Sequence, residues 1–479
     1  MRNLIYLFSV FLFTSCLSED EQFSEINFKF NEVKLIVIEN PVDDVYMWGI
    51  KKDTIYPNDK NEFVFRKKIS SPQHINININ GNIIHSILQP KNKLHISYKD
   101  SSFVFKGKNN EGIRLLNNLK RDYYSFSEAD KYKKDSTTNQ IEKNIENQKN
   151  KEIQQVSNLI NNNEIDNEFA KLLKDEINYY YSNRTLEVIN DKLKTQKQNK
   201  EELNILFSNT IKKHPLDNLY KPSSWNEYAN TIYVRKPIVD LKNQNIITQD
   251  SLQNWWKNDK INEFEYNLIE KIKNKSIREK VLANYLNFSS RQDHFEKSLI
   301  KLFKRFFNEF PNSKYVKYLK REFRKNEEYH LKISKKMPET VHFVKGKNIS
   351  SLNELLNVIE ADKYYIDMWA TWCGPCKRQF KYNKDLNKTL KEKGYKKLYI
   401  SIDKPENIEK WKQDIKYYEL DGLHFLANQE FFVHFTNNYS PYKGSVSIPQ
   451  YLIVNQKDSI LESNAPRPSQ LKKLSEVLN

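Results

Sequence analysis

Cysteine is scarce in this chain, whose 479 residues include only Cys16, Cys373 and Cys376. Three cysteines cannot form a disulfide framework, so the Cys-X-X-Cys pair is catalytic, metal-binding or accidental. A structural zinc ion needs four ligands, yet the chain has no second cysteine pair and its nine histidines are scattered. We therefore predict no metal site. Lys377, in place of a histidine after Cys376, also excludes the attachment pattern of a c-type haem.

Long apolar runs are also lacking, and no segment is long enough to predict a transmembrane helix. The run from Leu4 to Phe13 is short and typical of the apolar region of a signal peptide. Thr14-Ser15 and then Cys16 follow it, which resembles a bacterial lipobox, although Phe13 stands where leucine is usual. This resemblance implies that residues 1–15 are a lipoprotein signal peptide and that Cys16 is lipidated. The alternative is an ordinary signal peptide followed by a chance cysteine.

The chain has no motif for nucleic-acid recognition, despite a formal net charge of +17. Lysine and glutamate are interleaved rather than clustered, and zinc-finger spacing, a basic zipper and the RNA-binding RNP motif are all missing. We therefore predict no nucleic-acid partner and assign the charge to solvated surfaces. Aromatic residues make up 13% of the chain, which is enough to fill hydrophobic cores and argues against disorder throughout.

Glycine and proline are missing from long stretches of the middle of the chain. No glycine occurs between Gly112 and Gly346, and no proline between Pro90 and Pro215. Apolar residues recur there at helical spacing, so we predict an α-helical domain over residues 111–337. The clearest stripes are Phe169, Leu172, Leu173, Ile177 and Tyr180, and Phe295, Leu299, Leu302, Phe303 and Phe306. Pro311-Asn312-Ser313 predicts a helix break, and the polar segment from Asp130 to Gln155 is compatible with a solvated helix or with partial disorder.

Before this region, residues 16–110 have the period of two that is typical of β-strands. Alternating residues predict strands, and Asn80-Gly81 predicts a hairpin turn. We expect an antiparallel, sandwich-like β domain. The predicted strands centre on Ile26, Phe28 and Phe30; Val33, Leu35 and Val37; Phe63-Val64-Phe65; Ile75, Ile77 and Ile79; Leu94-His95-Ile96; and Phe103-Val104-Phe105.

Residues 338–479 alternate between strand and helix patterns, which predicts an α/β domain. The predicted strands are Tyr364 to Ala370, Leu398 to Ile402 and Tyr451 to Val454. The predicted helices are Cys373 to about Leu390, Glu406 to Tyr418, Gln429 to Asn437 and Ser469 to Leu478.

The cysteine pair lies where the first of these strands meets a helix, in the segment Trp369-Ala370-Thr371-Trp372-Cys373-Gly374-Pro375-Cys376. Two cysteines three positions apart on a first helical turn can form a disulfide with little strain. Unpaired backbone N–H groups at the helix start stabilise a thiolate on Cys373. Cys376 lies deeper, and it can attack a mixed disulfide and release the reduced substrate. Pro375 fits the first helical turn, where a missing N–H costs little.

This segment resembles the thioredoxin superfamily, in which Trp372, Gly374 and Pro375 support the motif. The resemblance implies catalytic roles for Cys373, Cys376, Asp367 and Pro449. Asp367 would be a buried acid whose raised pKa lets it relay the proton of Cys376. Pro449 would be a cis-proline that faces the disulfide and holds substrate backbone, although Ile448 before it differs from the usual threonine or valine.

The spacing from Cys376 to Pro449 is longer than in plain thioredoxin. In this longer spacing the chain resembles the TlpA/ResA-like branch, which has an extra insertion. Ser401-Ile402-Asp403, Trp411 and Arg467-Pro468-Ser469 also suit that branch. The layout of lipobox, β domain, helical segment and thioredoxin-like fold resembles exported bacterial proteins of this kind. Outside residues 340–479 the chain shares only the order of its parts with these proteins.

From this resemblance we predict a cell-envelope thiol–disulfide oxidoreductase that is exported, lipid-anchored and faces the periplasm or the outer surface. It would reduce disulfides in envelope client proteins through Cys373 and Cys376, with no cofactor besides this pair, and receive electrons from a thiol donor in the membrane. The alternative is an envelope lipoprotein that binds a protein or a glycan through its β and helical domains, with the redox domain secondary. Replacement of Cys373 discriminates the two, because binding would survive it.

Overall fold

The computed structural model divides into two compact units, the first ending at Phe323 and the second beginning at Arg324. It describes residues 23–119, 121, 129–195, 199–344, 348–359, 362–440, 444–456 and 459–478. The predicted signal peptide and Cys16 lie outside the described residues. Within the described part, no helix combines the length and the apolar character that crossing a membrane requires.

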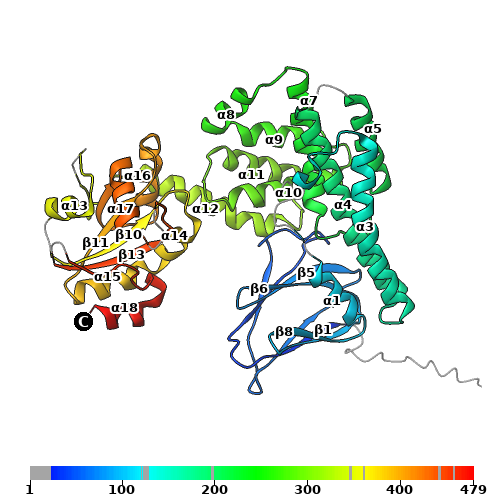
Figure 1. The fold of residues 1–479 in the computed structure, drawn as a ribbon, viewed down its shortest axis with the longest axis horizontal. Helices are drawn as coiled ribbons and strands as arrows, with labels where there is room; N and C mark the ends of the chain where they lie inside the picture. The colour runs from blue at the N-terminus through cyan, green and yellow to red at the C-terminus, as the bar shows by residue number, and fades with distance from the viewer. Residues whose placement is uncertain are drawn as a thin grey trace, which may run out of the picture. The chain divides into compact units, whose positions relative to one another are not determined.

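Two four-stranded sheets make up the β part of the first unit, with strand orders β4-β1-β7-β8 and β3-β2-β5-β6 (Figure 1). The predicted antiparallel arrangement needs one correction, because β1 and β7 pair in parallel while the other neighbours are antiparallel. The strands are β1 (Ser24–Lys29), β2 (Ile36–Glu39), β3 (Lys52–Ile55), β4 (Glu62–Lys67), β5 (Gln73–Ile79), β6 (Asn82–Leu88), β7 (Lys93–Lys99) and β8 (Ser102–Gly107).

The buried face of β2 differs from the predicted alternation of Val33, Leu35 and Val37. The structure buries Ile36 and Ile38 instead, and Leu35 is 40% exposed. Apolar residues stand at both odd-numbered and even-numbered positions of this segment. Alternation alone therefore could not predict which face of the strand is buried.

The helical part begins with α1 (Asn110–Asn118) and is built around α4 (Asn167–Thr195), a helix that is buried on most of its circumference. Most of the polar segment from Asp130 to Gln155, for which the sequence allowed either a solvated helix or partial disorder, lies in the helix α3 (Thr138–Asn161). This helix buries Ile141, Ile145 and Val156 and is capped by Thr137. The predicted break at Pro311 separates α11 from α12. The other helices are α5 (Lys200–Lys213), α6 (Trp225–Asn230), the π-helix η3 (Thr231–Arg235), α7 (Lys236–Asn243), α8 (Gln249–Lys257), α9 (Ile261–Glu270), α10 (Lys275–Ser290), α11 (Ser298–Glu309) and α12 (Val316–Ser334), with a short 3-10 turn η2 (Asp130–Tyr132).

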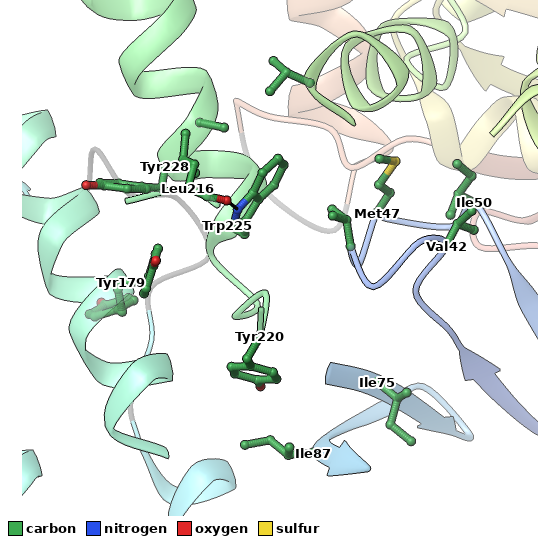
Figure 2. Packing of buried hydrophobic residues seen from close by; sticks show 14 of the residues in the cluster. Val42, Met47, Ile50, Ile75, Ile87, Tyr179, Leu216, Tyr220, Trp225 and Tyr228 are labelled. Carbon is green, nitrogen blue, oxygen red and sulfur yellow. Dashed lines mark hydrogen bonds between the residues drawn. The ribbon is translucent and has the colours of Figure 1, made fainter. Parts of the chain in front are cut away.

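The β and helical parts share one hydrophobic core, whereas the sequence predicted two domains divided at residues 110 and 111. Figure 2 shows Tyr220, from the segment before α6, lying close to Ile75 of β5 and Ile87 of β6. This shared core packs the β and helical parts into one compact unit. The predicted boundary at residue 337 also differs from the structure, because the division falls inside α12.

A buried polar cluster crosses the same junction. Glu176 of α4 accepts hydrogen bonds from the Tyr220 hydroxyl (2.5 Å) and the Ser223 hydroxyl (2.6 Å). The Nδ1 atom of His74, on β5, lies 3.3 Å from the Glu176 carboxylate. Burial raises the pKa of Glu176, but its interaction with His74 and the hydrogen bonds outweigh this and lower the pKa to about 2. The carboxylate therefore links the sheet to the helices as a satisfied buried anion.

The second unit contains a six-stranded sheet with the order β14-β13-β10-β11-β12-β9. The central strand β10 pairs in parallel with β11 and antiparallel with β13. The strands are β9 (Val341–Phe343), β10 (Tyr364–Trp369), β11 (Lys396–Ser401), β12 (Gly422–Leu426), β13 (Gln450–Gln456) and β14 (Ser459–Glu462). Strands β9, β12 and β14 were not predicted, because β9 and β14 are short edge strands and β12 has only a brief apolar pattern.

Helices cover both faces of this sheet. One face packs against α13 (Leu352–Val358) and α17 (Gln429–Asn438) through a cluster that contains Leu355 and Phe431. The opposite face packs against α14 (Gly374–Gln379), α15 (Asn383–Glu392), α16 (Ile408–Tyr417) and α18 (Leu471–Val477). The helix predicted from Cys373 to about Leu390 is wrong as a single helix, because the 3-10 turn η4 (Phe380–Tyr382) separates α14 from α15.

Candidate active site

Cys373 and Cys376 form a disulfide at the start of α14. Cys373 is the N-cap residue of this helix, and its Sγ accepts a hydrogen bond from the Cys376 N–H at 3.1 Å. Pro375 lies in the first helical turn, where its missing N–H leaves no hydrogen bond unmade. Cys373 is 3% exposed and Cys376 is fully buried, whereas Trp372 before them is 63% exposed. Both sulfurs are thus buried in the oxidised form, and the roles of Cys373 as attacking and Cys376 as resolving cysteine stay predictions.

Asp403 fixes the loop that carries Trp372 and Cys373. Its carboxylate accepts hydrogen bonds from the Thr371 N–H at 2.8 Å and the Thr371 hydroxyl at 2.7 Å. The Ser401 hydroxyl donates a third bond to the same carboxylate, also at 2.7 Å. Asp403 and Ser401 are buried, so these charge-assisted bonds hold the loop firmly. Sequence analysis noted both residues only as typical of the branch and did not predict this contact.

Asp367 lies on β10, on the sheet face that carries the cysteines. It is fully buried, and neither carboxylate oxygen has a hydrogen-bond partner among the described residues. Trp369, two places along the strand, shares its face and belongs to the cluster that contains Cys373 and Cys376. Burial raises the pKa of Asp367, against the lowering effect of nearby Lys397. The structure thus places a protonatable acid where the sequence predicted it, and its role in proton relay stays a prediction.

Lys397 of β11 is a second buried ionisable group on this face, and sequence analysis missed it. Its Nζ donates to the Asn383 amide oxygen at 2.5 Å and lies 4.6 Å from the centre of the Tyr399 ring. The Asn383 amide in turn donates to the Tyr399 hydroxyl at 3.1 Å. Burial lowers the pKa of Lys397, and the charge of Asp367 opposes this. Asp367 and Lys397 are thus two buried ionisable groups, each of which shifts the pKa of the other.

The peptide bond between Ile448 and Pro449 is cis, in agreement with the geometry that the resemblance implied. Pro449 directly precedes β13, whose Gln450 pairs with Met368 near the end of β10. Ile448 packs against the cluster that contains both cysteines. The cis bond therefore lies at the end of the sheet where the disulfide loop begins, and the binding of substrate backbone by this segment stays a prediction.

The described residues contain no group of three or more histidine, cysteine, aspartate or glutamate side chains suited to hold a metal ion. Asp367 and Lys397 are buried ionisable groups on the face of the sheet that carries the cysteines. The chemistry that this arrangement offers is thiol–disulfide exchange with a nearby buried proton carrier.

Comparison with known proteins places this domain in a class. The Redoxin family model matches residues 334–478. The thiol–disulfide oxidoreductase ResA of Oceanobacillus iheyensis is 39% identical over 51 residues, which are 11% of this chain and 27% of ResA. The chain thus spans about a quarter of the length of that curated relative. The C-terminal unit is a thioredoxin-like oxidoreductase domain.

The match to ResA agrees with the predicted resemblance to the TlpA/ResA-like branch, over the 51 residues that it covers. Two solved proteins from Bacteroides vulgatus are also similar to parts of the chain. A thiol–disulfide oxidoreductase solved in solution is 24% identical, with a TM-score of 0.22 and coverage of 30% of this chain and 92% of that chain. The thioredoxin domain of another is 18% identical, with a TM-score of 0.22 and coverage of 26% and 84%.

Proposed function

We propose that this protein is a cell-envelope thiol–disulfide oxidoreductase that reduces disulfides in client proteins through Cys373 and Cys376. The observation that carries the proposal is the disulfide at the start of α14, inside a Redoxin domain whose strand β10, ahead of Cys373, carries the buried acid Asp367. Gly374-Pro375 between the cysteines is the pairing of thioredoxin itself, which favours the reducing direction.

The reaction begins with the pair in its dithiol form. The Cys373 thiolate attacks one sulfur of the client disulfide, so that a mixed disulfide forms and the other client sulfur leaves as a thiolate. Cys376 then gives its proton to the Asp367–Lys397 pair, and its thiolate attacks the Cys373 sulfur. This step forms the Cys373–Cys376 disulfide and releases the second client thiolate. Two electrons pass from the pair to the client, and the client thiolates take up two protons.

Each turnover leaves the pair oxidised, so a reductant must restore the two thiols. The envelope compartment is oxidising and lacks a glutathione pool that could do this. We infer that a dithiol carrier at the membrane supplies the two electrons, by the same exchange chemistry in reverse.

The function is tested by reduction of insulin disulfides with dithiothreitol as electron source. The full chain without its signal peptide is expected to accelerate the reaction, and Cys373→Ser is expected to remove the acceleration because the attacking thiolate is lost. Thr389→Ser, a conservative change at a partly buried position of α15, serves as the control and is expected to retain activity. Equal rates for wild type and Cys373→Ser would contradict the proposal and favour a binding protein whose redox domain is secondary.

We place the protein at the membrane through a lipid on Cys16, on the basis of the lipobox-like segment that ends there. Expressed with its own signal peptide, the wild type is expected in the membrane fraction. Cys16→Ala is expected to shift the protein out of this fraction, because the lipid is the only anchor that the proposal invokes. Membrane association that is unchanged in Cys16→Ala would contradict the lipid anchor.

A further inference from the structure

An arginine borders the surface beside the disulfide turn. A Cβ atom placed on Gly374 would meet the Nη1 atom of Arg378 at 3.6 Å. Apart from its chain neighbours and the backbone of its own helix, no other atom of the described residues would lie within 4 Å. Gly374 is bonded to Cys373, and consecutive Cα atoms are about 3.8 Å apart, so Nη1 lies within about 9 Å of the Cys373 Cα atom. The guanidinium therefore flanks the open surface next to Cys373.

This guanidinium is exposed and forms no ion pair with any residue that the structure describes. Asp403, the carboxylate that anchors the turn, is turned inward and accepts hydrogen bonds from Thr371 and Ser401. Asp385, the first acidic residue after Arg378, is exposed on α15 and is not paired with it. The donors of Arg378 are therefore available to a carboxylate from another molecule, which an arginine can bind through two parallel hydrogen bonds.

The sequence around Arg378 adds charge of the same sign. Residues 373–384 include no aspartate or glutamate, and their basic residues are Lys377, Arg378, Lys381 and Lys384. Lys377 is buried and pairs with Asp414, whereas Lys381 and Lys384 are exposed and without an ion pair among the described residues. A surface on which one sign of charge dominates raises the local concentration of oppositely charged partners.

An aromatic side chain stands on the other side of Cys373 in the sequence. Trp372 is 63% exposed, although it lies between the anchored Thr371 and the buried Cys373. A client that brings a disulfide to Cys373 thus finds an exposed ring before this cysteine and a guanidinium after it. The ring offers apolar contact to clients of many sequences, and the guanidinium is the group that can discriminate among them by charge.

We propose that Arg378 is a specificity-determining residue, which favours client disulfides that have an aspartate or a glutamate next to the attacked cysteine. The proposal rests on the proposed function, because the reaction is the same exchange at Cys373, and it adds the chemical class of the client. The client carboxylate pairs with the guanidinium while the client sulfur approaches Cys373, which accelerates formation of the mixed disulfide. A lysine at the same place in the client is disfavoured by repulsion of like charges.

The test uses synthetic peptides that share one disulfide and differ only in the residue next to its first cysteine, which is glutamate, glutamine or lysine. A protein of residues 16–479 is reduced with dithiothreitol and freed of it, and the second-order rate constant of exchange is measured with each peptide by quenched flow. Loss of a cation near Cys373 can also change its thiolate. The readout is therefore the ratio of the rates with the charged and the glutamine peptides, in which such a change cancels.

The wild type is expected to react about threefold faster with the glutamate peptide than with the glutamine peptide at low ionic strength, as attraction over about 6 Å in water predicts. Arg378→Gln is expected to bring this ratio close to one, because the guanidinium is lost. Arg378→Glu is expected to reverse the preference, so that the lysine peptide reacts fastest. In 1 M salt, where the screening length is about 3 Å, all the ratios should approach one.

Lys391→Gln is the matched control for the loss of an exposed charge. Lys391 lies near the end of α15, which leads into the start of β11. There Lys396 pairs with Tyr364 at the start of β10, whereas the disulfide turn follows the end of β10. The control therefore removes a positive charge at the opposite end of the sheet, and it is expected to keep the wild-type ratios.

Two outcomes would overturn the proposal: a wild type that reacts equally fast with the glutamate and glutamine peptides, or a preference that is the same in Arg378→Gln and in the wild type. Arg378 is exposed, so we expect both of its variants to fold. A wild type that reacts with none of the peptides would instead defeat the proposed function itself, because the exchange at Cys373 would then be absent.

Discussion

Full-length protein with Cys376→Ser is expected to accumulate mixed disulfides between Cys373 and its clients. Cys376 is fully buried beside Cys373 and is held in the same helical turn, so its attack on the mixed disulfide is intramolecular. Such attack corresponds to effective molarities of up to about 10⁵–10⁸ M, and an external thiol at millimolar concentration cannot replace it. We expect client release to slow by at least about 10³-fold. The measurement is non-reducing electrophoresis of envelope extracts after acid quenching.

The control for this trap is the double change Cys373→Ser and Cys376→Ser, which removes the attacking sulfur as well. It should capture no client, and a reducing agent should release every adduct of the single variant. Adducts that persist in the double variant would mean that the captured proteins do not react at Cys373, and the assignment of the attacking cysteine would be wrong.

Asp367→Asn is expected to slow release of the mixed disulfide by about 10²-fold, the usual contribution of a positioned acid or base. Asparagine keeps the shape of the side chain but cannot take the proton of Cys376. Stopped-flow fluorescence of a reaction with a small disulfide substrate measures this step, and the first attack by Cys373 should change far less. Equal loss in both steps would indicate a general disturbance of the site rather than a lost proton acceptor.

The same substitution is expected to change how stability depends on pH. Burial raises the pKa of Asp367, so the folded protein holds this proton at pH values where the unfolded chain has lost it. The free energy of unfolding therefore falls as pH rises from the unfolded value through the folded pKa. Asp367→Asn removes that fall and should be more stable than wild type by about 1–3 kcal/mol at pH 8. Urea unfolding at several pH values checks this, and parallel curves for the two proteins would contradict it.

Lys397 makes the free energy of unfolding depend on pH in the opposite direction to Asp367. Burial lowers the pKa of Lys397, so between the folded and the unfolded pKa the unfolded chain binds more protons. Stability contributed by this group therefore rises with pH in that window. The slope from Asp367 lies below about pH 7 and the slope from Lys397 lies above it, because the pKa of each group is shifted to about 7. Asp367→Asn is therefore expected to remove the fall in stability below about pH 7 and to leave the rise above it.

The sequence was sufficient to predict the elements that carry a periodic or chemical signal. The strand before Cys373, the buried position of Asp367 and the strand after Pro449 each follow from apolar runs and from the motif. Spacing alone could not predict how the helix after Cys373 is divided. The 3-10 turn begins at Phe380, whose ring packs edge-on against Trp369, and no local sequence pattern reports this tertiary contact.

The residues that support the site were harder to predict from the sequence. Lys397 and Lys377 look like solvated lysines in a lysine-rich chain, and only the packed domain shows that both are buried. Their partners Asn383 and Asp414 come from other elements of the fold, at separations that no motif records. The shared core of the β and helical parts was missed for a similar reason, because each part has a periodic pattern of its own and the contact between them has none.

The central claim is tested most directly by the redox titration of Cys373 and Cys376 in a protein of residues 16–479. The protein is equilibrated in thiol–disulfide buffers and the free thiols are counted by alkylation and mass spectrometry. The account predicts one two-electron transition near the value of thioredoxin, about −270 mV, that disappears in Cys373→Ser. A transition near −120 mV would contradict the reducing direction, and the absence of a transition would contradict the redox function altogether.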